Sequence, residues 1–121
     1  DSEVLAHLFG EWLKSVSLEE AAKRFRNLDV GVVVVQTPSE VLVVGGRYRG
    51  IYMSKCEWGY VLASTIDGVV AGMSSALESD VNEFYEVEYL VFRRRKRGIE
   101  VNGVMKKVSA KRLRMFGWCD A

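Results

Sequence analysis

The apolar positions near the start of the chain recur at helical spacing. They form one broad stripe made of Val4, Leu5, Leu8, Phe9, Trp12, Leu13 and Val16. A stripe of this width is typical of a helix that lies on a core. Asp1 and Glu3 stand at the beginning of the run, where the helix dipole favours negative charge. The pattern predicts a first helix over about residues 2–15.

A second helix is predicted soon after the first. Ser17 is followed three positions later by Glu20. This is the spacing of a capping box, in which the hydroxyl accepts a backbone hydrogen bond and the carboxylate reaches back to the cap. We expect the helix to run to about Arg26 and to bury four apolar residues: Leu18, Ala21, Ala22 and Phe25.

The periodicity then changes to that of strands. Val30–Val35 is an almost continuous β-branched run, which predicts a strand covered on both faces. Residues 37–40 read as a turn with Pro38, the chain's only proline, at its second position. Val41–Val44 then predicts a second strand, so residues 30–44 form a hairpin.

The following segments predict short strands and one weak helix. Ile51–Met53 and Tyr60–Ala63 read as strands on either side of a turn at Gly59. Residues 66–77 favour a short helix, which Gly68 and Gly72 would weaken.

The last third of the chain predicts a meander. Residues 84–92 alternate, with Phe84, Glu86, Glu88 and Leu90 on one face and Tyr85, Val87, Tyr89 and Val91 on the other. Arg97-Gly98 and Asn102-Gly103 then predict turns. Two helices followed by a largely antiparallel sheet give an α+β fold.

Composition narrows the classes of protein further. A chain of 121 residues with 49% apolar and 27% charged residues is predicted to form a single domain, residues 1–121. It has no apolar run long enough to cross a membrane and no signal-peptide pattern, so we expect a cytoplasmic protein without membrane contact. Cys56, Cys119 and the single His7 do not make a four-ligand cluster. We therefore expect no metal, no cofactor and two free thiols.

Charge is distributed unevenly along the chain. Residues 1–90 carry 7 Lys and Arg against 14 Asp and Glu, whereas residues 91–121 carry 10 against 2. Nucleic acid or another polyanion is therefore one possible partner, bound through Arg93, Arg94, Arg95, Lys96 and Arg97, with further cations at Lys106, Lys107, Lys111, Arg112 and Arg114. The alternative is a solvated hairpin tip, because at most about half of a strand's side chains share one face.

The opening segment Asp1-Ser2-Glu3-Val4-Leu5-Ala6-His7-Leu8 resembles the D-[ST]-E-V-x-A-H-L segment of class II glutamine amidotransferases. It is most similar to the glutaminase domain of glucosamine-6-phosphate synthase (glutamine–fructose-6-phosphate aminotransferase). The resemblance continues in five later stretches: 18–35, Tyr60-Val61-Leu62-Ala63-Ser64, Glu86–Val91, and the closing segments 98–101 and 117–121. The chain departs from the family pattern at Thr65, at residues 46–51 and at Val87.

This resemblance implies a fold and an activity. The family fold is the four-layer α/β/β/α sandwich of the N-terminal-nucleophile hydrolases, and the chain is similar to the C-terminal half of that domain. The intact enzymes release ammonia from glutamine and transfer it to a sugar phosphate. The resemblance assigns Asp1 to the binding of the substrate's α-amino group. The alternative role for Asp1 is that of a helix N-cap. We expect His7 to be a packed or hydrogen-bonded structural residue rather than a catalytic one.

The family's catalytic elements are not found in this sequence. Residue 1 is Asp rather than the nucleophilic Cys, and the Arg, His-Gly and Asn-Gly elements of the family precede the opening segment. An acyl-transfer site without nucleophile and oxyanion donors does not turn over, so we expect no catalytic residue here and no glutaminase activity from this chain alone. The resemblance implies a missing N-terminal half, a partner chain or a homodimer, with glutamine as substrate of the assembled domain.

Overall fold

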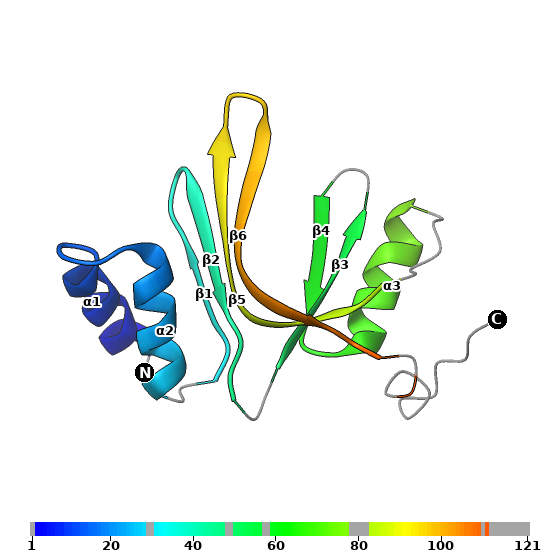
Figure 1. The fold of residues 1–121 in the computed structure, drawn as a ribbon, viewed down its shortest axis with the longest axis horizontal. Helices are drawn as coiled ribbons and strands as arrows, with labels where there is room; N and C mark the ends of the chain where they lie inside the picture. Colours follow the sequence, from blue (N-terminus) through cyan, green and yellow to red (C-terminus); the bar gives the residue numbers. More distant parts are fainter. Residues whose placement is uncertain are drawn as a thin grey trace.

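A computed structural model of the chain describes residues 2–28, 31–47, 50–56, 59–77, 83–109 and 111. These residues form three helices and one antiparallel sheet of six strands (Figure 1). The α+β class predicted from the sequence is confirmed. The elements, in order, are α1 (Ser2–Trp12), α2 (Leu18–Leu28), β1 (Val33–Gln36), β2 (Glu40–Val44), β3 (Ile51–Cys56), β4 (Gly59–Ala63), α3 (Ile66–Leu77), β5 (Tyr85–Arg95) and β6 (Gly98–Lys107).

Helix α2 begins at the predicted cap. The backbone N–H of Glu20 donates to Oγ of Ser17 at 3.2 Å, which satisfies one of the donors left unpaired at a helix start. The carboxylate of Glu20 lies 4.0 Å from Nε of Arg24. All four apolar residues expected to be buried in this helix are buried: Leu18, Ala21, Ala22 and Phe25.

Helix α1 is shorter and less buried than its apolar stripe predicts. It ends at Trp12 instead of about residue 15, and Phe9 is its one buried residue. The side chain of Phe9 stacks on Phe25 of α2 at 5.6 Å between ring centroids, and Trp12 meets the same ring edge-on at 5.0 Å. Val4 is 61% exposed because it lies outside this contact. The broad apolar stripe predicted for α1 is therefore wrong. A narrower stripe, formed by Leu5, Phe9 and Trp12, packs against the core.

The long strand β5 organises the sheet. On one edge, its first residues pair with β3 and its later residues pair with β2, so the β1–β2 and β3–β4 hairpins follow one another along the same edge. Strand β6 pairs with the other edge along the whole length of β5. The β5–β6 ribbon consequently bends from one hairpin to the other and curls the sheet (Figure 1).

A bulge at Glu88 allows this bend. The pairing of β5 with β6 shifts between Val87 and Tyr89, which leaves Glu88 as the extra residue. Its carbonyl accepts a hydrogen bond from the N–H of Gly45 at 2.7 Å, and its carboxylate lies 3.5 Å from the guanidinium of Arg26. Arg26 also donates to the carbonyl of Gly45 at 2.8 Å. Arg26 of α2 therefore contacts both the residue that follows β2 and the bulged residue of β5.

Because of the bulge, the alternation predicted for residues 84–92 is wrong after Glu88. Leu90 belongs to the same apolar cluster as Val87, whereas Val91 packs with α2. Because the extra residue reverses the pattern, Leu90 lies on the face predicted for Tyr85 and Val87, and Tyr89 and Val91 lie on the opposite one.

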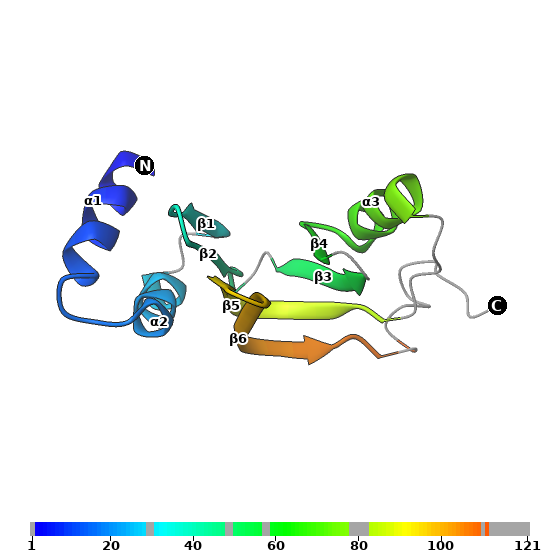
Figure 2. The ribbon, with the colours of Figure 1, turned by 90° about the horizontal axis from the view of Figure 1, so that it is seen from above.

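All three helices lie on the convex side of the curled sheet (Figures 1 and 2). Helices α1 and α2 pack with β2 and β5 around Phe25, Leu42 and Val91. Helix α3 packs with β3 and β4 through Ile66 and Val69. The concave side has its own cluster, and among the described residues it contains strand residues only: Val41, Val43, Ile51, Met53, Tyr60, Leu62, Tyr85, Val87, Leu90, Phe92 and Val101.

Two strand predictions need correction. Strand β1 starts at Val33 rather than Val30, and it is an edge strand in which Val34 is 60% exposed, so it is not covered on both faces. Asn102-Gly103 is not a turn but lies inside β6. A Cβ at Gly103 would collide with the carbonyl oxygen of Tyr89, so glycine is needed where β6 passes the bulged strand.

The packing of α3 on β4 explains why this helix contains two glycines, which have poor helix propensity. A Cβ at Gly68 would lie 2.8 Å from Cβ of Ala63, and one at Gly72 would lie 2.8 Å from Cγ1 of Val61. Both glycines therefore face β4 and let the helix lie close to the sheet. Close packing compensates for their poor helix propensity.

Candidate functional site

The start of α1 and the edge strand β1 border an apolar groove. The groove has a volume of about 360 Å³ and extends from Ser2, the first described residue, along β1. Its floor is formed by Phe9 and Phe25, and its wall by the backbone and side chains of residues 32–36. This is the place where the segment that resembles the glutaminase motif meets the sheet.

Asp1 itself lies outside the described residues, as do Cys119 and the segment 117–121. The role that the resemblance assigns to Asp1 therefore stays a prediction. Ser2, Glu3 and Val4 are exposed on the first turn of α1. The part of the motif that the structure describes is thus helical, and its first three residues are exposed to solvent while Leu5 and Leu8 are half-buried.

His7 is neither packed nor part of a catalytic pair within the described residues. Its side chain is 81% exposed, and its Nε2 lies 3.9 Å from a carboxylate oxygen of Glu3, one helical turn earlier. Of the two structural roles expected for His7, packed or hydrogen-bonded, the packed one is wrong, because this position of α1 is exposed, and the contact with Glu3 is the one that the structure gives it.

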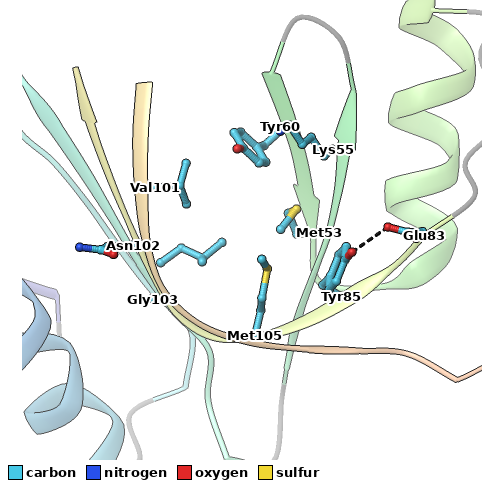
Figure 3. A pocket seen from close by; sticks show the side chains of 10 residues that line it. Met53, Lys55, Tyr60, Glu83, Tyr85, Val101, Asn102, Gly103 and Met105 are labelled. Atoms are coloured by element: carbon cyan, nitrogen blue, oxygen red, sulfur yellow. Dashed lines mark hydrogen bonds between the residues drawn. The ribbon is translucent and has the colours of Figure 1, made fainter. Parts of the chain in front are cut away.

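A larger hollow of about 670 Å³ opens on the concave side of the sheet. Figure 3 shows side chains from β3, β4, β5 and β6 pointing into it, among them Met53, Tyr60, Tyr85, Val101 and Met105. Asn102 points to the other side of β6, where its amide donates to Glu19 at 3.4 Å. Methionine and tyrosine side chains give this hollow an adaptable lining that is polar as well as apolar.

One end of the hollow is polar. The hydroxyl of Tyr85 donates to the carboxylate of Glu83 at 2.7 Å, and Nζ of Lys107 lies 3.3 Å from that carboxylate. The hydrogen bond from Tyr85 and the charge of Lys107 keep the pKa of Glu83 below its ordinary value. The same hydrogen bond raises the pKa of Tyr85. Lys55 extends over the ring of Tyr60, with Nζ at 5.9 Å from the ring centroid.

This hollow was missed by reasoning from the sequence. Its residues come from four strands, and the bulge at Glu88 is what places Leu90 beside Tyr85 on the same side. The only local signal is that each of these strands contains at least one methionine or tyrosine. That pattern indicates a half-buried strand and does not indicate a hollow.

The five basic residues 93–97 have two kinds of environment in the fold: some form ion pairs and the others are exposed. Arg93 makes a two-pronged ion pair with Glu19 of α2, at 2.8 and 3.0 Å, and its Nε lies 3.0 Å from Glu40 of β2. Arg95 pairs with Glu100 across the hairpin at 3.1 Å. Arg94, Lys96 and Arg97 are exposed, the last two in the turn between β5 and β6.

The described residues show no group of three or more His, Cys, Asp or Glu side chains that could hold a metal ion. No helix within them is long and apolar enough to cross a bilayer. The chain was also compared with protein-family models, with curated proteins and with solved structures, and none of the three comparisons gives a match.

Proposed function

We propose that this chain is the C-terminal half of a class II glutamine amidotransferase-like domain, similar to that of glucosamine-6-phosphate synthase. In the assembled protein this domain would release ammonia from glutamine for transfer to a sugar phosphate. The chain would supply helices, one sheet and the substrate carboxylate of Asp1. The nucleophile and the oxyanion hole would come from another segment or chain.

The observation that carries this proposal is the one-sided covering of the sheet. All helices in the described part lie on the convex side, while the concave side holds a strand-only apolar cluster and an open hollow. Apolar sheet faces are normally buried against another layer. The helix layer and the sheet layer, whose concave face carries apolar side chains around an open hollow, would correspond to two of the four layers of an α/β/β/α sandwich. We propose that a second sheet covers the concave side.

The secondary structure of the resembling segments agrees with this proposal. The opening motif leads into α1, and the Leu18–Phe25 segment is α2. Tyr60-Val61-Leu62-Ala63 is strand β4, and Ser64 follows at its end. The acidic segment Glu86–Val91 lies in β5, and residues 98–101 begin the closing hairpin strand β6. These described segments have the helix or strand structure that the resemblance implies, and residues 117–121 lie outside the described residues.

The test is to supply the missing part. The chain should be co-expressed with a polypeptide that carries the N-terminal cysteine half of such a glutaminase domain, and glutamate release from glutamine should be measured. We expect no release by the chain alone and release by the complex. A stable complex that does not release glutamate would contradict the function, and failure of the two to associate would contradict the sandwich.

A substitution at Asp1 tests the substrate contact in the active complex. Asp1→Asn should raise the KM for glutamine at least tenfold while kcat changes less, because a carboxylate binds an ammonium through a charge-assisted hydrogen bond. Glu3→Gln is the matched control, since it removes a neighbouring carboxylate that is exposed on α1. An unchanged KM in Asp1→Asn would leave only the helix-capping role.

A further inference from the structure

The β5–β6 hairpin presents a compact group of cations at its tip. Arg94, Lys96 and Arg97 are all exposed, and none of them has an ion pair with another described residue. The hairpin extends well beyond the β1–β2 hairpin next to it (Figure 1). The three charges are therefore accessible from several directions.

The neighbouring arginines have a different role. Arg93 is held by Glu19 and Glu40, and Arg95 is held by Glu100. Both side chains lie on the convex face of β5, whereas Arg94 lies on the concave face opposite Ile99. The run of five cations is thus made of two anchoring arginines and three free ones. Such a division is not visible in the sequence.

We propose that Arg94, Lys96 and Arg97 form a contact surface for nucleic acid, which they bind through the phosphodiester backbone. This inference goes beyond the proposed glutaminase role. A hairpin tip is far smaller than the roughly 800 Å² per partner of a standard protein interface, so the tip alone would make a poor protein interface. A two-stranded β-ribbon, in contrast, fits the major groove of B-DNA, about 12 Å wide, with phosphates along both sides.

The basic tip follows an acidic part of the chain. Residues 1–90 carry 7 basic and 14 acidic side chains, a formal charge of −7, and the whole chain without Arg94, Lys96 and Arg97 carries 14 and 16, a formal charge of −2. The acidic part repels a polyanion, while the projecting hairpin holds its cations away from it. Long-range attraction therefore orients the tip toward the nucleic acid.

The experiment measures fluorescence anisotropy of a labelled 20-base-pair DNA duplex against the full chain over a range of salt concentrations. Three phosphate contacts predict a slope of log K against log[salt] of about −2.7, or a loss of affinity of roughly 500-fold per tenfold rise in salt. The triple variant R94Q/K96Q/R97Q should lose the binding. The charge-matched control K14Q/K23Q/K106Q, which removes three exposed lysines elsewhere, should keep it.

Three outcomes would overturn the proposal. They are the absence of binding at low salt, equal loss in both triple variants, and competition by polyglutamate as strong as competition by unlabelled DNA at equal charge. The last result would assign the tip to an acidic polypeptide. Circular dichroism of both variants checks that the fold is kept, which is expected because all six positions are exposed.

Discussion

The guanidinium of Arg93 on β5 lies within 2.8 and 3.0 Å of the two carboxylate oxygens of Glu19 on α2. The two residues are 74 positions apart in the chain, and Glu40 of β2 adds a third contact to the same guanidinium. One side chain therefore connects the N-terminal helices, the first hairpin and the central strand. Bidentate pairs of this kind are the most specific ion pairs in proteins.

Removing this arginine should destabilise the whole fold. Arg93→Met leaves two partly buried carboxylates without their cation, and we expect a loss of about 2–3 kcal/mol in the free energy of unfolding. Urea denaturation followed by tryptophan fluorescence measures it. Arg95→Met is the control, because its pair with Glu100 is exposed at the hairpin tip and should contribute little. Equal effects of the two substitutions would contradict the anchoring role of Arg93.

The same pair predicts how stability depends on pH. The hydrogen bonds and the charge of Arg93 lower the pKa of Glu19 to about 2 in the folded protein, from 4.5. The folded state therefore binds a proton less readily than the unfolded state, so the contribution of Glu19 is complete above about pH 4.5 and is lost as the pH falls toward 2.

A comparison of the wild type with Glu19→Gln measures this contribution. The difference in unfolding free energy should be constant near neutral pH and should shrink between about pH 4.5 and 2. The comparison repeated in the Arg93→Met background should show almost no dependence on pH. A difference that persists unchanged to pH 2, or one that survives without Arg93, would show that another group is responsible.

Local features of this fold could be predicted from the sequence where the signal is itself local. The hydroxyl of Ser17 caps α2, the turn at Pro38 joins β1 and β2, and residues 66–77 form α3. In each case the deciding residues lie within a few positions of one another. A cap, a turn and an apolar period need no distant partner to be recognised.

Features that depend on a distant partner could not be predicted. Nothing near Glu88 marks it as a bulge, because its alternation with Val87 and Tyr89 is regular and the shift arises from pairing with β6. Asn102-Gly103 has the composition of a turn, yet its glycine is required by the carbonyl of Tyr89 on β5. The hollow has the same limitation, since the residues that line it come from β3, β4, β5 and β6.

A substitution at Gly103 tests the close approach of β6 to the carbonyl oxygen of Tyr89 on β5. Gly103→Ala would place a methyl group against the carbonyl oxygen of Tyr89 and close to Leu90, so β6 would have to move. We expect a loss of about 1–3 kcal/mol, as for overpacked cores. Gly10→Ala is the matched control, since a methyl group on that residue of α1 meets no atom within 4 Å. It should stabilise the protein by up to about 1 kcal/mol. Thermal unfolding of both variants would measure the contrast.

The concave hollow should make the isolated chain associate, either with itself or with a partner. Met105 and Val104 are adjacent on β6 and are 45% and 43% exposed, but Met105 lines the concave hollow and Val104 lies on the opposite face. We expect the wild type to bind an apolar dye and to sediment as a dimer or larger species, because without the proposed second sheet the hollow and the exposed side chain of Met105 stay uncovered. Met105→Glu should reduce both effects, whereas Val104→Glu should change them little. Both substitutions place a carboxylate on the same strand at similar exposure. A difference between the two variants in dye binding or association therefore depends only on which face of the sheet carries the carboxylate. A wild type that is monomeric and binds no dye, or equal responses of the two variants, would contradict the proposal that a second sheet covers the concave side.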